Sequence, residues 1–174
     1  MVWALWAIRT KRTEQRESVA SRLSYSLLLM AGFYLIFARS IPVLWLRQPI
    51  LPREAWVQVM GIAITAAGLL FAIWARLYLG TNWSGTVTVK VGHELVRSGP
   101  YRWVRHPIYS GLLLATIGTG IERGEVRGIL GFLFACAGFL IKLRREEKFM
   151  KATFGAQYDD YSRTTGALLP RPRT

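Results

Sequence analysis

The sequence predicts an all-α protein, a polytopic integral membrane helical bundle, and three observations support this prediction. Of the 174 residues, 52% are hydrophobic and 13% are aromatic. Several apolar runs have the length and composition of membrane helices. The 23 Lys and Arg residues outnumber the 10 Asp and Glu residues, giving a net charge of +13. Disorder requires low hydrophobicity, and a soluble basic protein rarely contains so much apolar sequence.

Four apolar runs predict four helical spans. Residues 55–75 carry no charged side chain and at 1.5 Å per residue reach about 30 Å, the thickness of a hydrocarbon core. Residues 23–38 form an earlier run, which is interrupted by Arg39 and resumes over residues 41–46. We expect Arg39 to extend toward the lipid headgroups near the end of that helix.

The third and fourth runs predict a tight helical hairpin. Residues 108–121 and 126–141 are each short for a full crossing, and the polar residues 122–125 separate them. We expect these polar ends to lie in the headgroup region. A buried hairpin in a soluble domain is the alternative, which the uncharged run over residues 55–75 disfavours.

The distribution of basic residues predicts the orientation of the bundle. Residues 9–22 hold five Lys and Arg, residues 76–105 hold five, and residues 142–174 hold eight, whereas the two remaining connections hold three and two. Cytoplasmic segments are enriched in Lys and Arg, so the N-terminal segment, the central loop and the tail should face the cytoplasm. We predict a single domain with two regions. Residues 1–79 are the N-terminal segment and the first membrane helices, and residues 80–174 are the catalytic region, with the central loop, the helical hairpin and a C-terminal helix.

The apolar N-terminal segment, residues 2–8, allows two interpretations. Seven residues cannot cross a bilayer, and the segment lacks the basic start and cleavage site of a signal peptide. It is either an interfacial anchor with Trp side chains at the headgroups or the last two turns of a helix whose beginning is missing. We favour the second interpretation.

Other classes of protein are disfavoured by composition. Cys136 stands alone, which excludes a disulfide scaffold, and one Cys with only two His makes a zinc site improbable. The basic charge is accounted for by membrane topology and contact with membrane lipids, and no nucleic-acid-binding motif accompanies it. Small residues recur along the apolar runs, and close helix packing is their expected role.

The central loop, residues 80–107, contains the first group of candidate functional residues. Alternation over residues 86–91 allows one short strand. Pro107 suits the first turn of a helix, and backbone amides from His106 to Tyr109 would then be free to bind a polar or anionic ligand. Gly111 would let a ligand approach the backbone. Taken alone, however, a histidine before a helix proline is as often only a cap.

The second group lies where the fourth run leaves the membrane. Lys142 and Glu146 are four residues apart and share one helical face, and Glu147 follows directly. Carboxylates near a helix C-terminus interact unfavourably with the helix dipole. A neighbouring cation, from the chain or from a ligand, should therefore compensate them, although a solvated charged helix end is the simpler explanation.

Five short motifs occur in a fixed order over this half of the chain. They are Gly99-Pro100-Tyr101, Arg105-His106-Pro107-x-Tyr109-x-Gly111, Glu146-Glu147, Phe154-Gly155-x-x-Tyr158-x-x-Tyr161 and Leu169-Pro170. This ordered set resembles the isoprenylcysteine carboxyl methyltransferase family and the related phospholipid methyltransferases. The resemblance runs from about Gly80 to Pro170, and each motif alone is weakly specific.

The resemblance implies a small membrane enzyme that uses S-adenosylmethionine and binds it on the cytoplasmic face through loops and a C-terminal helix. It implies cofactor contacts from His93, Glu94, Leu95, Val96, Tyr101, His106, Pro107, Ile108, Tyr109, Glu146 and Glu147. In the family, a basic residue one turn before the glutamate contacts substrate. Lys142 stands here where Arg is usual, and Arg144 is close by, so we take Lys142, Arg144 and Glu146 as candidate catalytic residues.

The implied acceptor is a lipophilic or lipidated carboxylate, because an ionised carboxylate needs no base before it accepts a methyl group. Three alternatives stay open. Phospholipid N-methylation shares the motifs, although an amine would first have to lose a proton. A sterol-type reductase would bind NADPH, and a non-catalytic membrane protein could retain the scaffold. No metal is expected.

Overall fold

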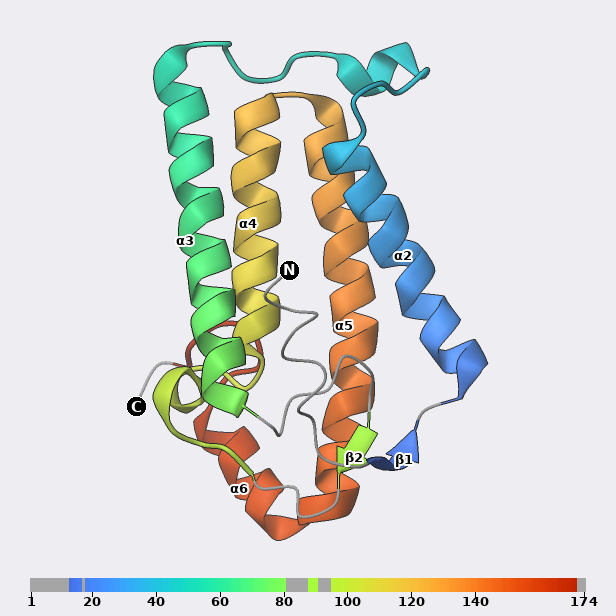
Figure 1. The fold of residues 1–174 in the computed structure, drawn as a ribbon, viewed down its shortest axis with the longest axis vertical. Helices are drawn as coiled ribbons and strands as arrows, with labels where there is room; N and C mark the ends of the chain where they lie inside the picture. The colour runs from blue at the N-terminus through green and yellow to red at the C-terminus, as the bar shows by residue number, and fades with distance from the viewer. Residues whose placement is uncertain (1–12, 17, 81–87, 91–94, 172–174) are drawn as a thin grey trace.

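The computed structural model describes residues 13–16, 18–80, 88–90 and 95–171. Its body is a bundle of four helices along the long axis of the molecule, as Figure 1 shows. These helices are α2 (Val19–Phe37), α3 (Ala55–Leu79), α4 (Pro107–Arg123) and α5 (Val126–Phe154). The shorter elements are β1 (Thr13–Arg16), η1 (Leu44–Arg47), β2 (Thr88–Lys90), η3 (Gly99–Arg102) and α6 (Ala156–Thr164). The apolar segment at residues 2–8 lies outside the described residues.

The helical membrane bundle predicted from the sequence is confirmed. Within the described residues, three helices, α2, α3 and α5, are long and apolar enough to cross a membrane. Helix α4 is shorter, with 17 residues, as its short apolar run indicated. Large apolar side chains stay exposed along the helices, among them Ile62 at 59% and Leu70 at 67%. Such outward apolar surface suits lipid, and the protein is an integral membrane protein.

Two details of the described chain differ from a plain helical bundle. Strands β1 and β2 pair antiparallel as a small two-stranded sheet, and β2 lies inside the strand expected over residues 86–91. Helix α2 ends at Phe37, and the apolar run that resumes over residues 41–46 does not extend it, because only the short η1 forms there. Pro42 accounts for the break, because it lacks an N–H and disfavours helical geometry in the preceding residue.

Small residues bring the helices together in two close pairs, as expected. Between α3 and α4, a Cβ added at Gly111 would lie 2.6 Å from the Gly68 carbonyl oxygen and 2.7 Å from the Ala72 nitrogen. Between α2 and α5, a Cβ at Gly32 would lie 2.8 Å from the Gly131 carbonyl oxygen. These backbone approaches require glycine. Gly111 therefore serves helix packing, and the expectation that it admits a ligand is wrong.

The α4–α5 hairpin is anchored to the loop that follows α2. The Ile50 N–H donates to the Gly124 carbonyl at 2.7 Å. Arg127 is buried, donates to Glu125 at 2.6 Å and donates to the Ala38 carbonyl at 2.7 Å. These contacts tie the connection between α2 and α3 to the hairpin at one end of the bundle.

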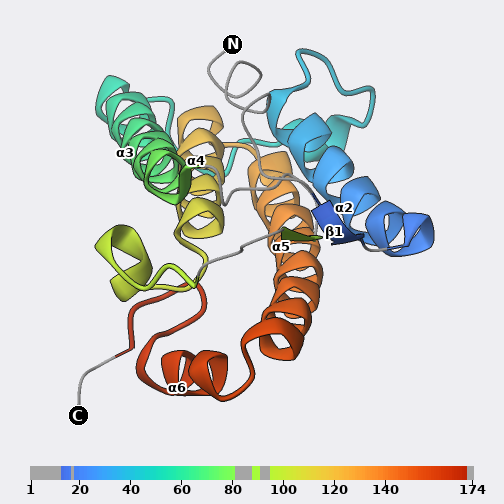
Figure 2. The ribbon, with the colours of Figure 1, turned by 60° about the horizontal axis from the view of Figure 1, so that its bottom comes forward.

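At the opposite end, the C-terminal segment folds back against the start of α4 (Figure 2). Val104 and Gly166 form a parallel bridge. The Arg105 N–H donates to the Gly166 carbonyl at 2.8 Å, and the His106 N–H donates to the Ala167 carbonyl at 3.0 Å. The chain thus closes over the N-terminal turn of α4, which carries the motif that begins at Arg105.

Candidate active site

His106 lies at the centre of a polar cluster between α4 and α5. It is the N-cap residue of α4, with Pro107 in the first turn, and its side chain is only 10% exposed. Its Nδ1 lies 3.5 Å from Oε2 of Glu146, and its Nε2 lies 3.4 Å from Oε1 of Glu147. The Nε2 atom is buried and makes no hydrogen bond within the described residues. Its contact with Glu147 is an ion pair without hydrogen-bond geometry, so a ligand acceptor could still take a hydrogen bond from this atom.

Tyr109 joins the same cluster from the first turn of α4. Its ring stacks on that of His106, with centroids 5.5 Å apart and an interplanar angle of 5°. Its hydroxyl donates to Oε1 of Glu146 at 2.5 Å. Its other neighbour is Phe139 of α5, at 4.9 Å between centroids. Stacking and the charge-assisted hydrogen bond together fix the orientation of the Glu146 carboxylate.

Lys142 lies one turn before Glu146 on α5. Its Nζ is 5.4 Å from the centroid of the Tyr109 ring and 5.6 Å from that of Tyr25 on α2. Lys142 thus lies one turn from the carboxylate of Glu146. Helix α5 continues to Phe154, so Glu146 lies more than one turn inside the helix, and the expectation that it meets the C-terminal end of the helix dipole is wrong. Arg144, the other candidate cation, is exposed on α5, and the structure does not bring it into the cluster.

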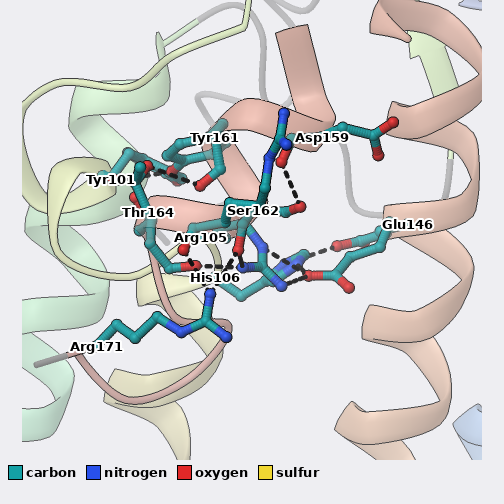
Figure 3. A network of polar contacts seen from close by, with 12 residues as sticks. Tyr101, Arg105, His106, Glu146, Asp159, Tyr161, Ser162, Thr164 and Arg171 are labelled. Atoms are coloured by element: carbon teal, nitrogen blue, oxygen red, sulfur yellow. Dashed lines mark hydrogen bonds and ion pairs between the residues drawn. The ribbon is translucent and has the colours of Figure 1, made fainter. Parts of the chain in front are cut away.

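Arg105 links the cluster to the C-terminal segment. Its Nε and Nη2 donate to Oε1 of Glu147 at 2.8 Å and 2.5 Å. Its Nη1 donates to the carbonyl of Ser162 at 3.1 Å and to that of Thr165. Figure 3 shows Arg105 beside Ser162, with His106 and Glu146 alongside. Glu147 is thereby held mainly by Arg105, which places it beside the candidate cofactor residues as a support.

The charges around His106 raise its affinity for a proton. Burial by itself would lower the pKa of His106, but the adjacent carboxylates of Glu146 and Glu147 outweigh it, and the pKa lies above its usual value. In its protonated state, the imidazolium compensates two half-buried carboxylates. The cluster can therefore hold the polar and charged parts of a small ligand in a site with little water.

Two buried tyrosines, Tyr101 and Tyr161, connect the elements around the His106 cluster. The Tyr101 hydroxyl donates to the Ala75 carbonyl at 3.3 Å, and the Tyr161 hydroxyl donates to the Tyr101 carbonyl at 2.5 Å. Burial raises the pKa of Tyr161 to about 12, so its hydroxyl stays a donor. Tyr101, predicted to contact the cofactor, thus makes structural contacts to α3 and α6 in the described chain.

The remaining predicted residues are placed as follows. Pro107 is buried, Ile108 is half-buried, and both belong to the first turn of α4 beside the cluster. Leu95 and Val96 are half-buried. His93 and Glu94 lie outside the described residues. Among the described residues no three His, Cys, Asp or Glu side chains form a group that could hold a metal ion, and the absence of a metal stays a prediction.

The backbone amides at the start of α4 are only partly available. The His106 N–H is taken by the Ala167 carbonyl, and the Ser110 N–H by the His106 carbonyl. The expectation of free amides from His106 onward therefore needs correction at its first residue. The C-terminal segment supplies the acceptor, and nothing in the local sequence around His106 indicates that contact.

Comparison with known proteins identifies the family. The phospholipid methyltransferase family model matches residues 56–157, more than half of the chain. The chain belongs to the phospholipid methyltransferase family. All of α4 and the parts of α3 and α5 that pack on it fall inside the matched residues, together with His106, Lys142 and Glu146.

Several relatives are named for the methylation of isoprenylcysteine or of a thiol. A protein-S-isoprenylcysteine O-methyltransferase of Xenopus laevis is 30% identical over 70% of this chain and 43% of its own length. One of Arabidopsis thaliana is 26% identical over 87% of this chain and 80% of its own length. A methanethiol S-methyltransferase of Mycobacterium tuberculosis is 31% identical over 87% and 64%. The resemblance to the isoprenylcysteine carboxyl methyltransferase family is confirmed.

A solved structure shares the fold. The eukaryotic intramembrane Ras methyltransferase ICMT superposes with a TM-score of 0.58 at 24% identity, over 87% of this chain and 51% of that one. The chain thus spans about half the length of that structure. At this identity the match supports the arrangement of the helices, and the activity has to be argued from the site.

Proposed function

We propose that this protein is an S-adenosylmethionine-dependent membrane methyltransferase whose acceptor is a lipophilic or lipidated carboxylate. One observation carries the proposal: within a membrane bundle of this family, buried His106 and Tyr109 hold the carboxylate of Glu146 beside the ammonium of Lys142. The site therefore offers adjacent groups for a cationic donor and an anionic acceptor.

The residues present fit the proposed methyl donor. The buried Nε2 of His106 contacts Glu147 as an ion pair but makes no hydrogen bond among the described residues, so its N–H can donate to an acceptor atom of the methyl donor. Glu146 suits the amino group or ribose, and the first turn of α4 adds Pro107, Ile108 and Tyr109. His93, Glu94, Leu95 and Val96 precede this turn and stay predicted contacts. When bound, S-adenosylmethionine would supply a methyl group on a cationic sulfur: an ionised acceptor would bond the methyl carbon as the carbon–sulfur bond breaks and S-adenosylhomocysteine leaves.

Each side chain then has a defined task. His106 and Tyr109 orient Glu146, and Arg105 holds Glu147 in place so that the carboxylate does not reach into the site. Lys142 attracts an ionised acceptor, which needs no base. The apolar surroundings exclude water and strengthen these attractions. Positioning supplies most of the rate enhancement in such a displacement.

The orientation of the site completes the proposal. The cluster lies at the bundle end that holds the central loop and the C-terminal segment, both rich in Lys and Arg. By the positive-inside rule this end faces the cytoplasm. The donor then arrives from the cytosol, while a lipid-like acceptor enters from the bilayer.

A thiolate is a second candidate acceptor, because the methanethiol S-methyltransferase of Mycobacterium tuberculosis aligns with 87% of this chain. A thiolate is also an anion that Lys142 would attract. A phospholipid amine, by contrast, would meet the Lys142 ammonium as a like charge when protonated. The placement of Lys142 therefore favours an anionic acceptor over an amine.

Calorimetric titration of the detergent-solubilised protein with S-adenosylhomocysteine and with NADPH tests the donor. We expect S-adenosylhomocysteine to bind and NADPH not to. Glu146→Gln should weaken binding about 10- to 150-fold, the range for a lost charge-assisted hydrogen bond. Glu54→Gln, at the far end of the bundle, is the matched control and should leave affinity unchanged. Binding of NADPH alone would replace the proposal with the reductase alternative, and binding of neither would indicate a non-catalytic scaffold.

A further inference from the structure

The ammonium of Lys142 is bracketed by aromatic rings from two different helices. Nζ lies 5.6 Å from the centroid of Tyr25 on α2 and 5.4 Å from that of Tyr109 on α4. Both distances are within the range of a cation–π attraction. Tyr25 is only 3% exposed, so its ring lies inside the protein and away from solvent.

Helix packing fixes the position of Tyr25. A Cβ added at Gly138 on α5 would lie 2.8 Å from Leu29 and 3.2 Å from the Tyr25 carbonyl, so α2 and α5 approach closely at this level. One turn toward the site end, Arg145 of α5 donates to the hydroxyl of Ser21 on α2. The Tyr25 backbone is therefore held between two fixed contacts, and its ring has a defined position over α5.

A lysine needs such support more than an arginine does. Its ammonium sits on a flexible four-carbon stem, and in a membrane protein it tends to extend toward water. Two rings that hold the ammonium in the site reduce the conformational entropy lost when an anion binds. Preorganisation of this kind increases the affinity for an anionic acceptor and leaves the affinity for a neutral one unchanged.

We propose that Tyr25 is a positioning residue for the acceptor: its ring holds the Lys142 ammonium in the site and so selects a carboxylate acceptor over its neutral ester. This inference rests on the proposed function. It also makes α2 part of the site, although α2 contains none of the five motifs and lies outside the residues that the family model matches.

The test is the ratio of two binding affinities, measured without methyl donor. N-acetyl-S-farnesyl-cysteine and its methyl ester differ only in the charge and methylation of the carboxyl group. We expect wild-type protein to prefer the acid, and Lys142→Met to lose that preference. Tyr25→Leu should reduce it about 2- to 30-fold, as expected for a lost cation–π contact, whereas Tyr25→Phe should keep it. Tyr34→Leu, which alters an exposed tyrosine on the same helix, should change nothing.

Each outcome separates the inference from the proposed function. Tyr25→Leu should bind S-adenosylhomocysteine as wild type does; if it does not, Tyr25→Met, which occupies similar space without a ring, replaces it. In the double variant Tyr25→Leu/Lys142→Met, the acid-to-ester ratio should equal that of Lys142→Met alone. Equal affinity of wild type for acid and ester, or an unchanged ratio in Tyr25→Leu, overturns the inference. Failure of wild type to bind S-adenosylhomocysteine instead overturns the proposed function.

Discussion

A single residue, His106, contacts three parts of the chain: the start of α4, α5 and the C-terminal segment. It ends the loop before α4, contacts two carboxylates of α5, and through its backbone N–H binds the C-terminal segment. The side chain of the neighbouring Arg105 also donates to α5, at Glu147, and to α6, at the Ser162 carbonyl. Two adjacent residues therefore join α4, α5 and the chain end, and their loss should affect both stability and ligand binding.

The raised pKa of His106 predicts a pH-dependent contribution to stability. Because the folded pKa lies above the unfolded value of about 6.5, the stabilisation is complete below pH 6.5 and is lost as the pH rises through the folded pKa. Thermal unfolding in detergent from pH 5 to pH 9 should show wild type losing its advantage over His106→Asn with rising pH. A difference between the two proteins that is constant over this range would contradict the assignment.

Much of the site could be predicted because its residues are close in sequence or on one helix face. His106, Pro107 and Tyr109 share one turn, and Lys142 and Glu146 share one face. Arg144 could have been set aside by the same geometry, since two residues along a helix turn the side chain about 200° away from Lys142. Tyr25 could not be predicted, because its contact with Lys142 depends on how α2 packs against α5.

At the scale of elements, glycines decide how closely the helices approach. The expectation that small residues mediate packing is confirmed, but which glycines are essential depends on tertiary contacts. On α4, Gly111 faces the backbone of α3, whereas a Cβ at Gly120 would be 3.5 Å from its nearest neighbour, an ordinary contact. The sequence shows both as glycines in one apolar run and cannot distinguish them.

This difference predicts opposite results for the same substitution. Gly111→Ala should destabilise the protein, because the new methyl group would collide with the α3 backbone. Gly120→Ala on the same helix should be neutral or slightly stabilising, since alanine has the higher helix propensity by about 1 kcal/mol. Thermal unfolding in the same detergent compares them. Equal melting temperatures would contradict the α3–α4 packing.

For the whole molecule, the two ends of the bundle have different roles. One end ties the hairpin to the loop after α2 through Arg127 and Gly124. The other end gathers the motifs, the C-terminal segment and most of the charged side chains of the site. Charge counting predicts that this second end faces the cytoplasm, and that orientation stays a prediction. The division into residues 1–79 and 80–174 within a single domain stays a prediction.

The proposed orientation predicts which residues can be labelled from each side of the membrane. A cysteine introduced at Gln48, in the loop at the hairpin end, should react with a membrane-impermeant maleimide in intact cells, in a Cys136→Ser background. A cysteine at Arg171, in the C-terminal segment, should react only after the cells are permeabilised. The reverse pattern would place the site on the outer face.

The central claim is that a methyl group passes from S-adenosylmethionine to an anionic acceptor. The most direct measurement is transfer of radiolabelled methyl to N-acetyl-S-farnesyl-cysteine by the purified protein. We predict label that mild base releases as methanol, as expected of a methyl ester, and at least about a tenfold lower rate in Glu146→Gln. Label that resists base, or label found on phosphatidylethanolamine instead, would contradict the carboxylate acceptor. No transfer to any acceptor by protein that binds S-adenosylhomocysteine would contradict the claim itself.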